Sequence, residues 1–344
     1  MKSKNTRRQF LKTSSGLLAA SLMAPMANAM PAILHRFGKH TSQVHGVRIG
    51  VITYSFRELP DQGAEATLDY IRQCGINYIE LMGGPAESYA GAPKNPVNMR
   101  ALFPLFRKRN QKQELTEEEK KTLAEGEEQL KLYRSELATW RASAPMQKFE
   151  AFATMYKKAG IEIYAFKPDA FGMQNTDAEI EYGLKAAKAL GASHVTLEHP
   201  SNDAHTLKLG KAAEKFGMKV GYHGHEQQTP TLWDTALSQS PANAMNLDFG
   251  HYVAAGNANP LAIIQSKSER IASMHIKDRK TKANGGDNLP WGTGDTPIAQ
   301  ALQLMRDNKY TFPATIELEY KIPDGSSPIE EVKKCVEFCK RALA

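Results

Sequence analysis

The sequence predicts an α/β fold in which eight parallel strands alternate with helices, the organisation of a (β/α)8 barrel. From residue 47 onward, short apolar runs alternate about eight times with amphipathic stretches of helical period, which is the pattern of parallel βα units. Eight such units in one domain of about 315 residues is the count expected for a closed barrel. The rival is a doubly wound open sheet, but no G-x-G-x-x-G follows the first run to support a dinucleotide-binding fold.

The predicted strands are rich in Ile, Val, Tyr and Phe, which favour a pleated and buried conformation. In chain order they occupy residues 47–56, 76–84, 161–168, 193–200, 218–226, 244–251, 271–278 and 314–320. Several of the helices predicted between them end at a glycine, as helices commonly do. These glycines are Gly75, Gly160, Gly191 and Gly217.

Residues 85–145 interrupt the alternation after the second predicted strand. The segment begins with a Pro/Gly-rich stretch and continues into the charged sequence LTEEEKKTLAEGEEQLKLYRSELATWR. Thr116, followed by acidic residues, predicts the capped start of a helix. We therefore expect a helical insertion with a solvated charged face. Because the loop that carries it follows a strand, it lies on the active-site side of a barrel and could act as a lid.

Residues 1–29 predict an export signal rather than part of the fold. The paired arginines Arg7 and Arg8 precede Phe-Leu-Lys, and a short apolar run ends at the small residues Ala-Asn-Ala. This order is typical of signal peptides, and the arginine pair resembles signals of the twin-arginine pathway. The run is too short to stay in the membrane as a spanning helix. The sequence thus predicts a periplasmic or secreted protein whose single barrel domain is residues 30–344.

The predicted signal also carries most of the positive charge. It contains five Lys and Arg residues and no acid, so its removal lowers the formal net charge from +7 to +2. A nucleic-acid partner would need a basic face and is not supported. Of the three cysteines, Cys335 and Cys339 lie four residues apart on a predicted helix. That spacing is unfavourable for a disulfide, and no disulfide framework is expected.

Side chains that bind metals or transfer protons recur at the carboxyl ends of the last five predicted strands, where (β/α)8 barrels hold their active sites. They are Glu198, His223, His225, Asp248, His251, His275, Lys277 and Glu317. Side chains alternate in direction along a strand, so His223 and His225 point the same way. The same holds for His275 and Lys277. One such group at the same end of five successive strands favours a shared functional cluster over isolated structural residues.

This cluster offers carboxylate and imidazole groups without a thiolate. Such a mixed oxygen and nitrogen site suits Mn²⁺, Mg²⁺, Co²⁺ or Zn²⁺, and composition does not choose among them. A divalent metal ion there could polarise a carbonyl and stabilise an enediolate. Neighbouring Glu, His or Lys groups could then move protons at carbon.

The order of several motifs resembles the xylose-isomerase-like TIM barrels, a group that includes sugar-phosphate isomerases and epimerases, inosose dehydratases and tagatose epimerases. The resemblance covers roughly residues 45–343. It rests on YSFREL, GYHGHE, NLDFGHYVAAG, MHIKD, WGTGDTPI and TIELEY, in that order. Together these motifs are fairly specific for the superfamily and much less so for any one reaction.

The resemblance implies a metal ion held by Glu, Asp, His and Glu from successive strands. Asp248, His275 and Glu317 match the last three positions. Many relatives place the first Glu at the end of the fifth strand, where this sequence has His223. Glu198, one strand earlier, is the carboxylate that we favour for this place, and His223 is its rival.

The usual pair of catalytic glutamates is not obvious here, so the proton carriers stay open. The candidate catalytic residues are His225, His251, Lys277 and Glu317. Histidine is the easiest base near neutral pH, whereas Lys277 could stabilise an oxyanion or simply pair with Asp278 or Glu317. The candidate substrate-binding residues are Lys167, His223, Glu226 and Trp291, the last in a glycine-containing loop where its ring could stack on a sugar.

These features favour a metal-dependent isomerase or epimerase that acts on a sugar or sugar derivative through an enediolate intermediate. A metal-dependent lyase or hydratase acting on a keto-glycoside is the first alternative, and a non-catalytic carbohydrate-binding barrel is the second. Export favours an unphosphorylated small-molecule carbohydrate as the substrate. We expect no nucleic-acid partner and no permanent membrane anchor, and a homo-oligomer is compatible with the sequence.

Overall fold

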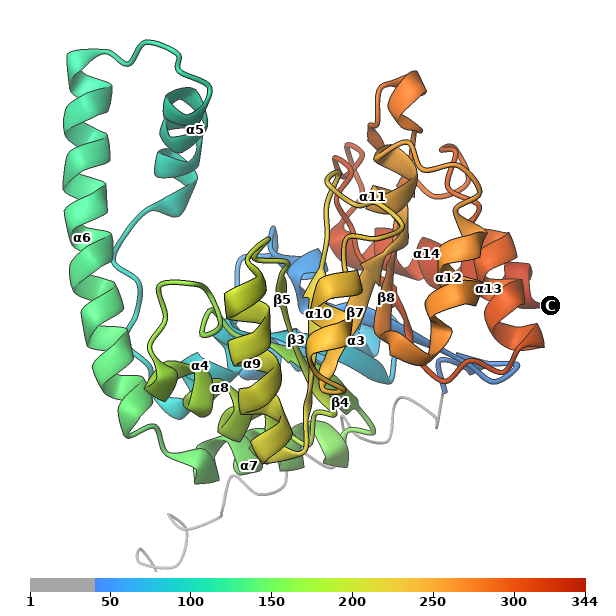
Figure 1. Ribbon diagram of the computed structural model, residues 1–344, viewed down its shortest axis with the longest axis horizontal. Coiled ribbons are helices and arrows are strands. Elements are labelled where there is room, and N and C mark those ends of the chain that lie inside the picture. Colours follow the sequence, from blue (N-terminus) through green and yellow to red (C-terminus); the bar gives the residue numbers. More distant parts are fainter. Residues whose placement is uncertain (1–40) are drawn as a thin grey trace, which may run out of the picture. The chain divides into compact units, whose positions relative to one another are not determined.

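The structure is a computed structural model that describes residues 41–344. The predicted signal, residues 1–29, lies outside this range. As predicted, eight parallel strands form a closed barrel surrounded by helices (Figure 1). Around the barrel the strands are β2 (Val47–Ile52), β3 (Tyr78–Met82), β4 (Glu162–Lys167), β5 (His194–Glu198), β6 (Lys219–His223), β7 (Asn243–Asp248), β8 (Ile271–Ile276) and β11 (Ala314–Ile316). Pairing of β11 with β2 closes the barrel.

The strands are shorter than the apolar runs that predict them. The first run continues as a 3-10 turn, η2 (Thr53–Phe56), because the chain bends there towards its first helix. The last strand ends at Ile316, so Glu317 lies just beyond it. A short strand β1 (Gln43–Val44), which lies before the first predicted strand, pairs antiparallel with β2.

Helices cover the outside of the barrel and follow the strands in turn. They are α3 (Ala64–Gln73), α7 (Met146–Lys158), α8 (Asp177–Ala189), α9 (Asp203–Phe216), α10 (Asp234–Gln239), α11 (Phe249–Ala254), α12 (Leu261–Lys267), α13 (Ile298–Asp307) and α14 (Pro328–Leu343). The predicted glycine stops are confirmed. Gly75, Gly160, Gly191 and Gly217 all have positive φ, a conformation that glycine adopts without steric cost.

The interior of the barrel is polar, whereas branched apolar side chains commonly fill this architecture. Deep inside, His194 Nε2 lies 3.0 Å from Ser273 Oγ, and Tyr164 Oη lies 2.6 Å from Thr315 Oγ1. The main apolar core includes buried residues of both the strands and the covering helices. A column of polar side chains therefore leads through the barrel towards the carboxyl ends of the strands.

Between β3 and α7 the chain forms the predicted helical insertion. It contains α4 (Gly83–Ala90), α5 (Met99–Asn110) and α6 (Glu117–Ala142), and Figure 1 shows α5 and α6 extending beyond the barrel. Thr116 and Glu119 form a reciprocal capping box at the start of α6, which confirms the predicted helix start. The Pro/Gly-rich beginning is partly helical because Pro85 lies in the first turn of α4, where no backbone N–H is needed.

The insertion has its own small core and a buried polar attachment to the barrel. The core is formed by Leu102, Leu105, Leu123 and Leu130. At the end of α6, the buried guanidinium of Arg141 lies 2.9 Å from the Glu87 carboxylate of α4 and 3.1 Å from the Glu179 carboxylate of α8. These contacts fix the base of the insertion, and its role as a lid stays a prediction.

None of the helices between residues 41 and 344 combines the length and the apolar character needed to cross a membrane. Cys74, Cys335 and Cys339 are buried and free.

Candidate active site

Four of the predicted strand-end residues meet inside the barrel. His223 ends β6, Asp248 ends β7, His275 lies in β8 and Glu317 follows β11. One potential ligand atom from each lies within 4.8 Å of the others, and all four residues are buried. Asp248 and His275 are paired in register on neighbouring strands, so their side chains enter the barrel at the same height. We call these four residues the mouth cluster.

Carboxylates hold His275 at both ring nitrogens. Its Nδ1 lies 2.8 Å from Glu317 Oε2, and its Nε2 lies 2.8 Å from Glu80 Oε2. Glu80, in β3, is fully buried and also accepts hydrogen bonds from Thr196 and Asn246. Because Glu80 occupies Nε2, Nδ1 is the nitrogen that faces the rest of the mouth cluster. A carboxylate behind a histidine in this way orients the ring of a metal ligand.

These contacts set the charges of the buried groups. Burial alone would lower the pKa of His275, but Glu80 and Glu317 outweigh burial and raise it to about 10. Burial would raise the pKa of Glu80, but the charge of His275 and its hydrogen bond hold that pKa below the ordinary value. Without a metal, His275 is therefore a cation between two carboxylates. Metal binding at Nδ1 would release its proton.

His223 presents an unsatisfied buried atom. Within residues 41–344, its Nδ1 forms no hydrogen bond, although such buried atoms normally have a partner. Burial, reinforced by the charges of Lys167 and His275, lowers the pKa of His223 well below its ordinary value. Its imidazole is therefore neutral, the form that binds metals. Two imidazoles and two carboxylates fit a divalent transition metal or zinc.

Lys277 places a positive charge against the mouth cluster. Its Nζ lies 2.8 Å from Asp248 Oδ2, 2.6 Å from Glu317 Oε2 and 2.7 Å from Glu319 Oε2. Burial would lower the pKa of Lys277, but these three carboxylates raise it. Lys277 is therefore an ammonium group and not a base. It pairs with Glu317, one of the two partners considered from the sequence, while Asp278 is engaged elsewhere.

A second group of polar side chains lies beside the mouth cluster. The rings of His225 and His251 are 4.5 Å apart between centroids, and His251 Nε2 lies 3.3 Å from Glu319 Oε2. Arg279 donates hydrogen bonds to Glu226 and to His251 Nδ1. The side chains of His225 and Glu226 are about half exposed. This second group therefore connects the buried mouth cluster with solvent.

Glu198, the ligand favoured from the sequence, lies outside the mouth cluster. Its half-exposed carboxylate lies 2.8 Å from Lys167 Nζ and 3.6 Å from His225 Nε2. The fourth position of the cluster is filled by His223, the rival, on the neighbouring strand. Lys167 is engaged by Glu198 at the mouth of the barrel. The choice between Glu198 and His223 as a ligand stays a prediction that binding experiments can decide.

Asp278 organises the loop that follows β8. One of its carboxylate oxygens accepts hydrogen bonds from the backbone N–H groups of Gly292, Thr293 and Gly294. A Cβ atom on Gly294 would lie 2.1 Å from the other oxygen of Asp278, so glycine permits this close approach. The glycines of this loop thus let its backbone lie close to the Asp278 carboxylate.

Trp291, in the same loop, packs edge-to-face on Phe338 of α14, with ring centroids 5.7 Å apart. Among residues 41–344, no ring contact or hydrogen bond found for Trp291 joins it to the mouth cluster. Its expected stacking on a sugar stays a prediction.

Three residues of the site, Glu80, Arg279 and Glu319, are not among the candidates named from the sequence. Glu80 sits in the middle of the apolar run INYIELMGG, and a charged residue inside a predicted buried strand is the signal that could have found it. Arg279 directly follows the motif MHIKD. Its place after a predicted strand end is the only sequence signal that indicates a site residue. Glu319 is the third carboxylate at Lys277 and lies two residues after Glu317, on the same side of the chain.

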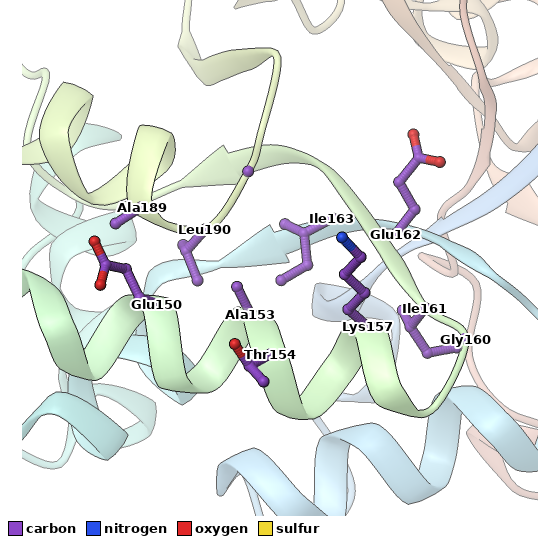
Figure 2. Close-up of a pocket in the computed structure, with 11 residues that line it drawn as sticks. Glu150, Ala153, Thr154, Lys157, Gly160, Ile161, Glu162, Ile163, Ala189 and Leu190 are labelled. Carbon is purple, nitrogen blue, oxygen red and sulfur yellow. The ribbon is translucent and has the colours of Figure 1, made fainter.

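A cavity of about 600 Å³ lies elsewhere, between α7, the start of β4 and the end of α8 (Figure 2). Lys157, Glu162 and Leu190 are among the residues that line it. Glu162 begins β4, so this cavity is at the amino-terminal end of the strands, whereas the chemistry of (β/α)8 barrels lies at the opposite end. No residue of the mouth cluster lines it, and we regard it as a surface groove.

The barrel and its carboxyl-end cluster define the class of protein. The sequence model of the family described as "Xylose isomerase-like TIM barrel" matches residues 129–342, more than half of the chain. The chain belongs to this family, which confirms the resemblance seen in the sequence. All four residues of the mouth cluster lie within the matched range.

The individual proteins to which the chain is similar share less than a third of their residues with it. The inosose dehydratase of Clostridium beijerinckii is 29% identical over 154 residues, which cover 39% of this chain and 51% of that protein. The chain thus spans about half the length of the curated relatives it matches.

Two solved structures illustrate the shared fold. The 3-keto-D-glucoside 4-epimerase from E. coli has a TM-score of 0.55 at 11% identity, with 86% and 99% of the two chains covered. An IOLI protein with a bound zinc atom has a TM-score of 0.55 at 13% identity, with 86% and 97% covered. The named relatives include a dehydratase and an epimerase, both enzymes.

Proposed function

We propose that the chain is a metal-dependent enzyme that moves a proton at a carbon next to a carbonyl of a sugar or sugar derivative. One observation carries the proposal. Four potential metal ligands, His223, Asp248, His275 and Glu317, lie within 4.8 Å of one another at the carboxyl ends of the barrel strands. The names of the relatives, an inosose dehydratase and a 3-keto-D-glucoside epimerase, support this class of substrate.

The mouth cluster would hold the metal through His223, Asp248, Glu317 and the Nδ1 atom of His275, while Glu80 fixes the His275 ring. A divalent ion bound there polarises a substrate carbonyl and stabilises negative charge on its oxygen. The zinc-containing relative supports a divalent metal. The two imidazoles favour Zn²⁺, Co²⁺ or Mn²⁺ over Mg²⁺, which prefers oxygen ligands.

The proton transfers fall to groups beside the mouth cluster. Lys277, an ammonium group among three carboxylates, is suited to stabilise negative charge on a substrate oxygen. His225 is the candidate base, because it is half exposed at the mouth and its Nε2 lies 3.6 Å from Glu198 Oε2. Glu317 is the buried carboxylate that would face the substrate from the metal side.

Two reactions begin with removal of the same proton. Returning the proton to the opposite face or to the neighbouring carbon gives an epimerase or an isomerase, which is the reaction we favour. Loss of a hydroxyl group from the adjacent carbon gives a dehydratase, a form of lyase. The similarity to inosose dehydratases makes dehydration the second candidate. The enzymatic names of the relatives weigh against a carbohydrate-binding barrel without activity.

The substrate class also depends on the location of the protein. We infer from the twin-arginine pattern at Arg7 and Arg8 that the protein is exported. An exported enzyme meets unphosphorylated sugars, since phosphosugars are mostly confined to the cytoplasm. A fusion of residues 1–40 to a reporter would test this step. Retention of the reporter in the cytoplasm would contradict it and would reopen phosphorylated substrates.

Metal content tests the proposal first. The purified protein is incubated with Mn²⁺, Co²⁺ or Zn²⁺, freed of unbound metal, and analysed for bound metal. We expect about one equivalent in the parent protein and none in the Asp248→Ala/His275→Ala double variant. His223→Ala and Glu198→Ala separate the rival ligands, because only loss of the true ligand weakens binding. A parent that binds no metal under any of these conditions would remove the metal mechanism.

The loaded protein is then incubated with keto sugars, 3-keto-glucosides and inososes. In D2O an epimerase or isomerase exchanges a carbon-bound hydrogen for deuterium, whereas in H2O it leaves the substrate mass unchanged. A dehydratase yields a product lighter by one water molecule, and another lyase releases an aglycone. Binding without any of these changes would favour the carbohydrate-binding barrel.

A further inference from the structure

Arg279 lies in the short strand β9 (Asp278–Arg279), beside His251 and Glu226. It is only 6% exposed. Its guanidinium donates to the Gly286 carbonyl, to the Glu226 carboxylate and to Nδ1 of His251. All three partners therefore accept hydrogen bonds from one buried, rigid group.

The chemistry of the guanidinium decides what His251 can do. Arginine stays protonated in proteins and has N–H donors but no acceptor. A nitrogen that accepts from it must carry a lone pair, so Nδ1 of His251 has no proton. The single proton of a neutral imidazole is then on Nε2. The ring itself is anchored, because the His251 backbone N–H donates to Asp248 Oδ1 at 2.7 Å.

The Nε2–H group of His251 faces the mouth of the barrel. It lies 3.3 Å from Glu319 Oε2, yet Nε2 is buried and forms no hydrogen bond of good geometry within the described part of the chain. Glu319 is already engaged by Lys277 at 2.7 Å. A buried donor without a well-placed acceptor is costly, and a sugar hydroxyl or carbonyl oxygen entering the mouth would satisfy it.

We propose that Arg279 is a positioning residue that holds His251 as a neutral hydrogen-bond donor, with its Nε2–H directed at an oxygen of the bound sugar. The identity of that sugar rests on the proposed function, whereas the protonation pattern of His251 does not. In this role Arg279 acts through His251 and needs no contact of its own with substrate or metal.

With its proton on Nε2, His251 is excluded from two other roles. Ring nitrogens of His223, His225 and His251 lie within 4.8 Å of one another, an arrangement that could hold a second metal ion. Zinc would need a lone pair on the His251 nitrogen that it binds, and Arg279 directs that lone pair to Nδ1, away from the mouth. For the same reason Nε2 cannot accept a proton as a general base. His225, which Arg279 does not contact in the described structure, keeps that role.

The protonation pattern is tested by NMR of protein labelled with ¹⁵N in its histidines, in EDTA and again with Zn²⁺. Couplings between ring nitrogens and carbon-bound protons show which nitrogen carries the proton, and His251→Gln assigns the signal. We expect the Nε2–H form in the parent and in Glu226→Gln, which keeps the guanidinium. Arg279→Met should shift His251 towards the Nδ1–H form, and Arg279→Lys should restore part of the parent pattern. Lys282→Ala is the matched control, because Lys282 lines one small surface cavity together with Arg279 and Glu226.

Either of two results would overturn the proposal. One is an Nδ1–H signal for His251 in the parent protein, and the other is an unchanged signal in Arg279→Met. Metal content gives an independent check, because His251→Gln should bind as much Zn²⁺ as the parent. Loss of one equivalent from a two-equivalent parent would assign His251 to a second metal site. If the parent binds no metal at all, the proposed function fails while the NMR result still decides the role of Arg279.

Discussion

The mouth of the barrel and the helix α6 of the insertion both carry Lys–Glu pairs, at nearly the same separation. Lys277 Nζ lies 2.6 Å from Glu317 at the mouth, and Lys120 Nζ lies 2.6 Å from Glu117 on α6. The side chain of Lys277 is 2% exposed and that of Lys120 is 58% exposed. Because water screens the exposed pair and not the buried one, equal distances have unequal consequences.

The two regions also differ in the sequence separation of the charged residues that pair. On α6 the pairs join residues three or four positions apart on one helix, and such pairs contribute only a few tenths of a kcal/mol. At the mouth the carboxylates come from β7 and from the segment after β11, and closure of the barrel forces them together. Burying several charges is expensive unless they are paired, and such arrangements are common where a protein needs unusual protonation states.

Removing the positive charge at the mouth should have the largest effect. Lys277→Met leaves the buried Asp248 without its nearest cation and leaves Glu317 with His275 alone, and we expect a loss of about 3–5 kcal/mol in the free energy of unfolding. Urea denaturation in EDTA measures the loss. Added Zn²⁺ should recover part of it, since a metal in the mouth cluster replaces the missing charge.

Lys333→Met is the matched control for Lys277→Met, because Lys333 pairs with Glu330 on the surface and is 41% exposed. It should change the free energy of unfolding by less than about 0.5 kcal/mol. If the Lys277 variant is as stable as this control in EDTA, the mouth carboxylates are not charged in the way their contacts indicate.

A second effect should appear as a dependence of stability on pH. Burial lowers the pKa of His194 to about 4, and its ring is held between Ser193 and Ser273. Between pH 6.5 and 4 the unfolded chain therefore binds a proton that the folded chain excludes. Stability falls as the pH falls through this window, by about 3 kcal/mol in total for this one group.

His194→Gln should remove that contribution. We expect the parent to lose up to about 1.4 kcal/mol more per pH unit than the variant between pH 6 and 4.5. Urea denaturation at several pH values in EDTA measures both slopes, and the other histidines contribute equally to each. Parallel curves would show that His194 accepts a proton inside the folded barrel.

The fold was predictable because its determinants are local. Alternating apolar runs and helical stretches indicated all eight barrel strands, and left-handed glycines marked helix ends. The direction of strand side chains also predicted that His223, Asp248, His275 and Glu317 would gather at one end. Local pattern does not fix the register between strands, and therefore not the height of each side chain in the barrel. The preference for Glu198 over His223 has another origin, the carboxylate that the family resemblance implies at this place. The two residues are paired in register on neighbouring strands, and the choice between them stays a prediction.

The missed parts of the site depend on contacts between distant segments. Glu80 meets His275 across 195 positions of sequence, and nothing near Glu80 in the sequence announces that partner. The contacts of Trp291 also come from other segments, because Asp278 holds its loop and its ring rests on Phe338 of α14. Its stacking on a sugar stays a prediction. A sequence pattern can identify such residues as candidates, but only the packing of the whole barrel assigns their contacts.

The smallest effect should come from the insertion. Lys120→Ala removes an ion pair whose two side chains are 58% and 90% exposed, and we expect the free energy of unfolding to change by less than about 0.5 kcal/mol. The same urea denaturation measures it, at low and at high salt. A loss above about 1 kcal/mol that disappears on dilution of the protein would mean that this surface of α6 is covered by a second copy of the chain. A homo-oligomer, which is compatible with the sequence, would then be built through the insertion. The charges of α6 would in that case be covered by a second chain instead of being exposed to solvent.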